Sequence, residues 1–441
     1  MRNRRIALAA LFLLAGCLLS LAVYNLPPVH ARLAWRVAEL RSRLYYALNP
    51  PQEVVFVPQE QQALLEVIVQ ATLQALQPSA TPTQLPSLTP LPNQPGPTAT
   101  AEPSPTATLS PTTIPEKVIL SGLVHEYQQM NNCGPATLAM ALSFWGWQGD
   151  QRDTRLFLRP NFASVDDKNV SPEEMAVFVE RFTGLKAQVR VGGEIDLIKR
   201  LVAAGFPVLI EKGFQPPKED WMGHYEVING YDDSRGRFIT QDSYIMADFP
   251  LPYDQLSGRW WRDFNYVYLV IYPPEREAEV LSVLGPHADP LYNAQQAAQK
   301  ALEEIAALSG RDLFFAWFAR GSSLVALGDY PAAAQAYDQA FAVYADLPEE
   351  ERPWRNLWYQ SGPYAAYYHS GRYQDVISLA NTTLSFLSKP VLEESFYWRG
   401  LAKEGLGDAE GALKDLTKAA SLNPNFSLAV EALRSRGAPA P

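Results

Sequence analysis

The sequence is poor in the side chains that most metal and redox sites require. Its 441 residues contain two cysteines, Cys17 and Cys133. Two cysteines cannot form a disulfide-stapled scaffold, nor a zinc or iron–sulfur site built from several thiolates. The five histidines lie far apart and form no HExxH motif: His30, His125, His224, His287 and His369. We therefore expect neither a bound metal nor another cofactor.

Clustered basic residues and phosphate-binding motifs are also missing. Asp and Glu number 47 against 37 Lys and Arg, which gives a formal net charge of −10. Affinity for nucleic acid comes mainly from clusters of Lys and Arg, and an acidic chain without basic runs is a poor nucleic-acid binder. No GxxxxGK[ST] motif occurs, so we expect no nucleotide-binding domain of that type.

The first recognisable feature is an apolar run near the N-terminus. Arginines within residues 2–5 precede the run, which extends from Ile6 to Tyr24. Nineteen helical residues would span about 28 Å, close to the ~30 Å hydrocarbon core of a bilayer. We favour an uncleaved signal-anchor over residues 1–28, with the bulk of the chain outside the cytoplasm at the cell membrane. A lipobox-like sequence ending at Cys17 makes a lipoprotein one alternative, and a cleaved signal peptide is the other.

Two segments separate this run from the globular part of the chain. Residues 29–77 carry apolar positions at helical spacing, which predicts a helical stalk or, alternatively, helices at the membrane interface. Residues 78–116 are a Pro/Thr/Ser-rich linker, with eleven prolines between Pro78 and Pro115. Such a segment cannot bury enough apolar surface to offset chain entropy, so we expect a disordered, extended spacer.

Residues 117–275 have the pattern of one α+β domain. Residues 133–144 predict a buried helix, and Ser171-Pro172-Glu173-Glu174 is typical of a helix start. Another helix is predicted over residues 195–204. The predicted strands are 118–124, 186–191, 207–211, 224–231, 237–241 and 266–272. Helices followed by several strands favour an α+β fold.

Residues 288–435 predict an all-α repeat. Glycines recur seven residues apart at 321 and 328 and again at 400 and 407, and a similar phrase follows Gly328, Gly371 and Gly407. The pattern resembles the tetratricopeptide repeat, whose nominal period is 34 residues, although Tyr364 replaces the first glycine of the middle unit. Solenoids of this kind present a concave surface, and the resemblance implies a protein partner there.

Cys133 is the candidate nucleophile. It follows a polar stretch and starts a predicted helix. A thiol at a helix N-terminus meets the positive end of the helix dipole and unpaired N–H groups, which favour the thiolate. On its own, the same residue can equally be a buried free cysteine with a structural role.

Two other residues strengthen the case for chemistry at Cys133. His224 begins a predicted strand, and Asp242 follows the hairpin that returns beside it, so the two side chains are expected within reach of each other. A thiolate, a base and a carboxylate that orients the base are the parts of a Cys-His-Asp site. Each residue alone also has an ordinary structural interpretation. His125 is a rival base, although its strand position favours a structural role.

These segments give residues 117–275 a family resemblance. With NCGPAT at 132–137, GHYEVINGYD at 223–232 and DS at 242–243, the region resembles the papain-like cysteine peptidase domain of the bacteriocin-processing family, in its stand-alone form. The resemblance implies that Cys133 is the nucleophile, His224 the general base and Asp242 the orienting carboxylate. It also implies a preceding glutamine as oxyanion-hole donor, for which we prefer Gln128 over Gln129. In that family the peptidase domain is also found fused to bacteriocin exporters, which carry a nucleotide-binding domain. This sequence has no motif of such a domain, so the export role does not transfer.

The sequence therefore predicts a membrane-anchored, extracytoplasmic cysteine peptidase-like hydrolase. Its expected substrate is a peptide or protein, its repeats would bind a protein partner, and its N-terminal helix would bind the membrane. Alternatives stay open: an inactive peptide-binding or adaptor protein, or an amidase or acyltransferase of the same fold. Trp221, Trp260 and Trp261 either line the cleft or pack in the core.

Overall fold

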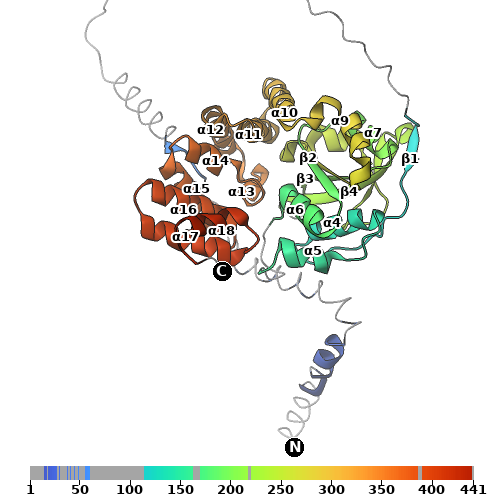
Figure 1. The fold of residues 1–441 in the computed structure, drawn as a ribbon, viewed down its shortest axis with the longest axis horizontal. Coiled ribbons are helices and arrows are strands. Elements are labelled where there is room, and N and C mark those ends of the chain that lie inside the picture. The colour runs from blue at the N-terminus through green and yellow to red at the C-terminus, as the bar shows by residue number, and fades with distance from the viewer. Residues whose placement is uncertain are drawn as a thin grey trace, which may run out of the picture.

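The computed structural model describes residues 114–161, 169–216, 220–385 and 390–439, together with 55–59 and scattered positions between 14 and 48. The predicted anchor, stalk and linker lie mostly outside these residues, and so does Cys17. Among the described residues, none of the helices has both the length and the apolar character needed to cross a membrane. Two parts are visible: a sheet with its covering helices, and a purely helical region beside it (Figure 1).

The first part is built on a seven-stranded sheet in which every pairing is antiparallel. The strand order is β2 (Lys186–Arg190), β7 (Tyr268–Tyr272), β3 (Val208–Phe214), β4 (Met222–Asp232), β5 (Arg237–Gln241) and β6 (Phe249–Pro252), while β1 (Lys117–Ile119) pairs with β4. The predicted strands are present, but β1 is shorter than the predicted 118–124. Sequence reasoning did not identify β6, whose two prolines are unusual in a strand.

Helices cover both faces of this sheet. One face packs against α4 (Cys133–Phe144), α5 (Gln151–Leu158) and α6 (Pro172–Phe182), through a core that includes Leu209, Tyr225, Val227 and Leu269. The other face packs against α7 (Ile195–Ala203) and α9 (Glu277–Leu284), through Val208, Ile210, Ile228 and Val270. Successive strand residues point to opposite faces, so neighbouring positions on β3 serve two separate cores.

The predicted start of α6 is confirmed in detail. The Ser171 hydroxyl accepts the Glu174 N–H at 3.1 Å, and the Glu174 carboxylate accepts the Ser171 N–H at 2.8 Å. This reciprocal capping box satisfies two backbone donors that the helix leaves unpaired, while Pro172 occupies the first turn. The helix α5 was not predicted from the sequence; Asp150 and Asp153 form an equivalent box at its start.

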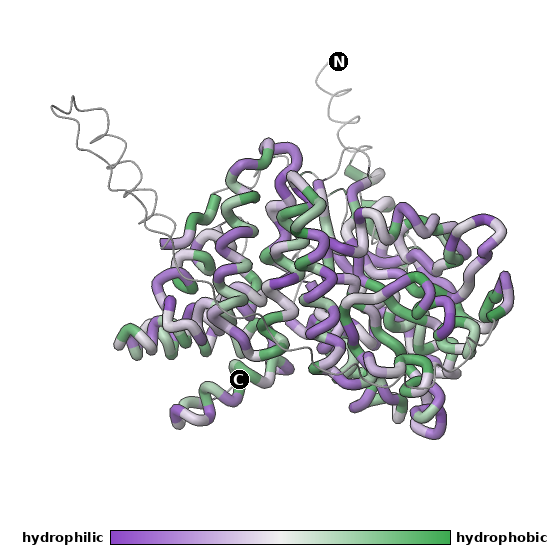
Figure 2. The backbone as a smooth tube through the Cα atoms, turned by 90° about the horizontal axis from the view of Figure 1, so that it is seen from above, coloured by the Kyte–Doolittle hydropathy of each residue, from purple (hydrophilic) through white to green (hydrophobic). Residues whose placement is uncertain are grey.

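The helical region follows directly. Its main helices are α10 (Pro290–Ile305), α11 (Gly310–Ala326), α12 (Tyr330–Asp346), α14 (Gly362–His369), α15 (Tyr373–Ser385), α16 (Glu393–Gly405), α17 (Ala409–Leu422) and α18 (Ser427–Ser435), with the short α13 (Asn356–Tyr359) between them. Apolar and polar positions alternate along these helices (Figure 2), as amphipathic packing requires.

The glycines that suggested a repeat have a common geometry. Gly328, Gly371 and Gly407 each follow the first helix of a pair, with φ angles of 75°, 75° and 89°. Glycine adopts this left-handed conformation without steric cost, which allows the chain to turn into the next helix. The helical character of residues 288–435 is thus confirmed, whereas membership of the tetratricopeptide class stays a prediction.

A buried polar contact joins the two parts. The Asp263 carboxylate accepts hydrogen bonds from Trp221 Nε1 (2.8 Å) and from the Arg311 guanidinium of α11. Trp221 also packs against Phe315 of α11. Trp221 is 4% exposed and Trp261 is fully buried, so both belong to the interior, as the core-packing alternative proposed.

Candidate active site

Cys133 occupies the first position of α4. The residue two before it, Asn131, has a φ of 50°, and the N-cap residue Asn132 makes no side-chain cap hydrogen bond. The rest of the helix is anchored in the core; for example, the Thr137 hydroxyl donates to the Tyr225 carbonyl at 3.1 Å. The half-buried thiol is free, and it therefore lies at the positive end of a rigid helix.

Gln151 fixes the loop that leads to Cys133. Its carbonyl oxygen accepts from Asn132 Nδ2 (2.8 Å) and the Gln129 N–H (2.7 Å), and its amide nitrogen donates to Glu126 (2.8 Å) and to the Tyr127 carbonyl (2.8 Å). A buried side chain that satisfies four partners restricts the loop strongly. Sequence reasoning missed Gln151, because nothing local distinguishes it from a surface glutamine.

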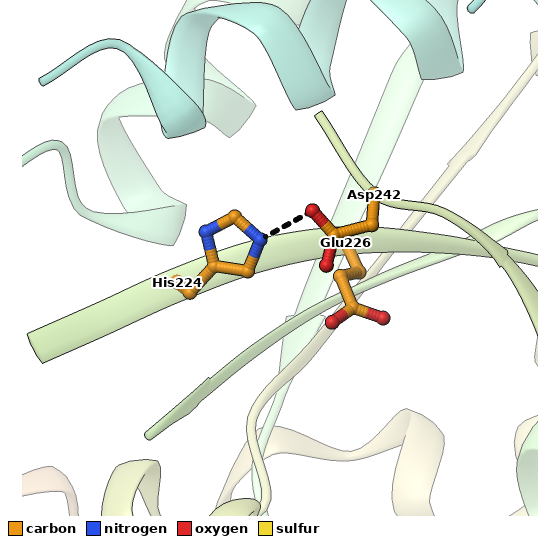
Figure 3. A group of neighbouring side chains, drawn as sticks. All are labelled: His224, Glu226 and Asp242. Carbon is orange, nitrogen blue, oxygen red and sulfur yellow. Dashed lines mark hydrogen bonds and ion pairs between the residues drawn. The ribbon is translucent and has the colours of Figure 1, made fainter. Parts of the chain in front are cut away.

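His224 and Asp242 form a buried pair. The Nε2 atom of His224 lies 2.9 Å from Oδ1 of Asp242, and the residues are 2% and 0% exposed. The same Asp242 oxygen accepts the N–H groups of Tyr244 (2.7 Å) and Ile245 (2.9 Å). These bonds hold the carboxylate on the segment after β5. Figure 3 shows the hydrogen bond between Asp242 and His224, which lies on β4.

The pair is charged near neutral pH. Burial acts to lower the pKa of His224, but the negative charge of Asp242 and the interactions with Asp242 and Cys133 raise it to about 10. Burial acts to raise the pKa of Asp242, and the charge of His224 outweighs it, so this pKa is lowered. An imidazolium beside a carboxylate is the resting arrangement that a thiolate–imidazolium site uses.

Cys133 is among the groups that raise the pKa of His224, which indicates that its side chain lies near the ring. Because Asp242 occupies Nε2, Nδ1 is the ring nitrogen that remains for the sulfur. The fold thus brings Cys133, from the start of α4, to His224 and Asp242, from β4 and the end of the hairpin.

Gln128 lies next to this group. Its side-chain oxygen accepts a hydrogen bond from the Ser243 hydroxyl at 2.9 Å, and its backbone N–H donates to the Ser243 carbonyl at 2.9 Å. With its oxygen engaged, the amide nitrogen of Gln128 is the end left to donate. Gln129 is exposed and is bound through its backbone to Gln151. The side-chain bond to Ser243 distinguishes Gln128 from Gln129, and the oxyanion role of Gln128 stays a prediction.

His125 lies nearby in a different state. Burial lowers its pKa, with Asp242 acting in the opposite direction, and its ring packs edge-on against Tyr127 at 4.9 Å between centroids. Its ring nitrogens form no well-oriented hydrogen bond among the described residues, although Gln241 lies close enough to oppose the effect of burial on the pKa. His224, in contrast, is hydrogen-bonded to Asp242. His224 is therefore a better candidate base than His125.

A second buried ion pair lies below His224. Lys212 Nζ is 2.9 Å from Glu226 Oε1, the two side chains are 5% and 0% exposed, and Thr240 donates to Glu226 Oε2 at 2.8 Å. The Phe214 ring stacks on His224 at 4.8 Å between centroids. Sequence reasoning missed Lys212 and Glu226 in this role, although Glu226 shares a strand face with His224.

The cluster of His224, Glu226 and Asp242 has the composition of a metal site. One ligand atom from each lies within 4.8 Å of the others (Figure 3). However, Lys212 already neutralises Glu226, and Asp242 is paired with a protonated His224. A divalent ion would add positive charge beside two cations, so these residues fit a metal poorly.

A buried carboxyl, that of Glu211, also lies near Cys133. Glu211 of β3 is 3% exposed and faces Tyr225 across the strand pair. Burial is the largest cause that raises the pKa of Glu211 well above its usual value, and the nearby Cys133 acts in the same direction. The raised pKa favours the uncharged form of this buried carboxyl.

Comparison with known proteins covers this same region. Residues 123–264 match the model of the Peptidase_C39 like family. This matched region contains the candidate site. Cys133, His224, Asp242 and Gln128 all lie inside the matched residues. A similar solved structure is a candidate C39-like peptidase from Bacillus anthracis, with 19% identity, coverage of 36% of this chain and 98% of that chain, and a TM-score of 0.31. No curated protein matches the chain.

Proposed function

We propose that the C39-like domain is a cysteine peptidase-like hydrolase that cleaves peptide or amide bonds, with Cys133 as nucleophile, His224 as general base and acid, and Asp242 as the orienting carboxylate. The observation that carries the proposal is the buried His224–Asp242 pair, 2.9 Å apart, whose imidazole also interacts with Cys133. The match of residues 123–264 to a peptidase family supports the same chemistry.

The reaction follows from these positions. The Cys133 thiolate attacks the carbonyl carbon of the scissile bond, and the carbonyl electrons move to oxygen. Protonated His224 then donates its Nδ1 proton to the leaving nitrogen as the C–N bond breaks, which releases the amine and leaves a thioester on Cys133. Neutral His224 next takes a proton from water, whose oxygen attacks the thioester. The acid is released, and the thiolate and imidazolium are restored.

Two donors support the oxyanion in this scheme. One is the backbone N–H of Cys133, which is unpaired at the start of α4. The other is the side-chain nitrogen of Gln128, oriented by the bond between its oxygen and Ser243. Donors fixed before the reaction stabilise charge at little reorganisation cost, and removal of one such donor costs about 10²–10³-fold in kcat in other enzymes.

We extend the proposal to the rest of the chain. Residues 1–28 act as a signal-anchor, and the C39-like domain and the helices lie outside the cytoplasm. The helical region serves as a protein-binding surface. The apolar run at 6–24 and the glycine pattern at 328, 371 and 407 support these two roles.

The test is the pH dependence of Cys133 alkylation. The full chain in detergent carries Cys17→Ser, so Cys133 is its single thiol. We expect rapid reaction at pH values well below the free-thiol pKa of ~8.5, and a shift toward that value in His224→Ala. His369→Ala, which changes a histidine far along the chain, should leave the profile unchanged. If Cys133 titrates as a free thiol in the chain with His224 intact, the thiolate–imidazolium pair does not exist and the hydrolase proposal fails.

A further inference from the structure

Residues 55–59 lie in a groove of the helical region. They have no helical or strand structure over 55–58, and Phe56 and Pro58 are buried while Val55 and Val57 are half-buried. Alternate burial is the pattern of an extended peptide that presents every second side chain to a surface. The segment comes from the N-terminal part of the chain, yet it contacts helices more than 250 positions further along.

Phe56 fills an aromatic pocket. Its ring meets that of Phe341 of α12 edge-on, with centroids 5.0 Å apart, and lies 6.3 Å from that of Tyr367 of α14. Phe56 belongs to the same apolar cluster as Phe314 and Tyr344, against which Leu357 also packs. Phe56 is 7% exposed. Burial of an aromatic ring among other rings supplies most of the free energy of peptide-type contacts.

A polar group anchors the backbone beside this pocket. The Gln59 N–H donates to Oδ1 of Asp375 at 2.8 Å. Asp375 is 3% exposed, and its other oxygen accepts from Arg372 Nε at 2.8 Å. Arg372 in turn binds Asp338, which also accepts from the Tyr367 hydroxyl at 2.9 Å. The carboxylate that receives the segment is therefore held in place by a buried network.

This combination has the parts of a peptide site. The aromatic pocket selects a side chain, and Asp375 recognises a backbone N–H three residues later without regard to the side chain there. We propose that the groove formed by α12, α14 and α15 is a binding site for an extended peptide with an aromatic residue two positions before a proline, and that its resident ligand is residues 55–59 of the same chain.

Binding of residues 55–59 within the same chain limits how far the folded body can lie from the N-terminus. Residues 60–113 connect the bound segment to residue 114, where the C39-like part begins. While the segment is bound, residue 59 and residue 114 are both attached to the folded body. Residues 60–113 then add nothing to the distance between the N-terminus and that body. Release of the segment would place residues 60–113 between the N-terminal part of the chain and residue 114.

Competition by a free peptide tests the proposal on the full chain. The probe is a fluorescent peptide with the sequence of residues 52–62. In the unaltered chain the resident segment competes, so we expect the apparent affinity of the probe to be at least tenfold weaker than for the Phe56→Ala chain. Gln59→Ala is the matched control, because alanine keeps the N–H that Asp375 binds; it should behave as the unaltered chain. A probe with Phe56 replaced by alanine should not bind either chain.

Hydrogen exchange of the Gln59 amide gives a second readout that needs no variant. We expect protection of this amide in the unaltered chain, and loss of the protection when saturating probe peptide is added. Failure of the probe to bind the Phe56→Ala chain overturns the proposal. So does protection that no concentration of probe removes, since the segment is then a permanent part of the core. Neither readout depends on Cys133, so both are independent of the proposed hydrolase activity.

Discussion

His224 Nε2 and Asp242 Oδ1 lie 2.9 Å apart, although 18 positions separate the two residues in the sequence. The β4–β5 hairpin brings them together, and two backbone N–H groups hold the Asp242 oxygen in position. The pairing with Asp242 favours the charged form of His224 and leaves Nδ1 as the ring nitrogen that can face the substrate. Replacement of Asp242 therefore offers the most direct test of the proposed chemistry.

Asp242→Asn should impair catalysis without removing the hydrogen-bond acceptor. The neutral amide no longer stabilises the imidazolium, so the pKa of His224 falls from about 10 and the alkaline limb of the pH–rate profile moves to lower pH. We expect kcat to fall by about 10²–10⁴-fold, the usual contribution of an oriented proton-transfer group. The measurement is the pH–rate profile on a fluorogenic peptide. Asp196→Asn, at an exposed position in the first turn of α7, is the control. An unshifted alkaline limb in Asp242→Asn would contradict the assigned role.

The same pair should make stability depend on pH in a defined direction. The pKa of His224 is raised from 6.5 to about 10 in the folded chain. Its stabilising contribution is therefore complete below about pH 6.5 and is lost as the pH rises through about 10. The pKa of Asp242 is lowered from 3.8, so its contribution is present above about pH 3.8 and is lost as the pH falls through the lowered value.

The measurement is the thermal unfolding midpoint of the unaltered chain and of the double variant His224→Gln, Asp242→Asn. The difference between them should be constant from pH 4 to pH 6.5 and should shrink from pH 6.5 to pH 10. A difference that stays constant from pH 6.5 to pH 10 would mean that His224 is already neutral in the folded chain at pH 6.5.

Gln128 and Gln129 offer a matched comparison of adjacent side chains. Gln128 is held by Ser243, whereas Gln129 is exposed. If Gln128 is the oxyanion donor, Gln128→Ala should lower kcat by about 10²–10³-fold with little change in KM, because the lost bond forms mainly in the transition state. Gln129→Ala should change neither constant. Ser243→Ala should produce a smaller loss in kcat, since the amide of Gln128 remains but is less well oriented. Equal kinetics for the Gln128 and Gln129 variants would remove Gln128 from the mechanism.

Lys212→Met should destabilise the fold strongly. It leaves the Glu226 carboxylate without its cation in a fully buried position, and loss of one partner from a buried pair costs about 3–5 kcal/mol. Adding Glu226→Met should recover most of this loss, because the unpaired charge is then removed as well. The measurement is denaturant unfolding followed by far-UV circular dichroism. Lys186→Met breaks an exposed pair with Glu277 and should change the midpoint little. If the double variant is no more stable than Lys212→Met, the buried charge is not the cause.

Local sequence signals predicted much of the fold. The start of α4 at Cys133 and the capping box of Ser171 and Glu174 follow from residues that are adjacent or one turn apart. The β4–β5 hairpin follows from two apolar runs around a short polar turn. In each case the interacting groups are close along the chain, so the pattern and the contact coincide.

The parts that sequence reasoning missed depend on distant contacts. Gln151 orders the loop before Cys133 through side-chain bonds to residues about 20 positions away. Lys212 meets Glu226 only because β3 and β4 pair in one register. Phe56 was included in a predicted stalk region, and its binding site on α12 and α14 is formed almost 300 residues later. No local period or propensity carries that information.

The sequence by itself determined the kinds of group available: one thiol at a helix start, a histidine at a strand start, a carboxylate after a hairpin, and a chain without clustered cysteines or basic runs. Tertiary structure decided their states. Burial and pairing shift the pKa values of His224, Asp242 and Glu211, and the same packing put residues 55–59 against the helical region. The physical reason is that charge and affinity depend on the local dielectric and on neighbours in space, which the linear order of residues does not specify.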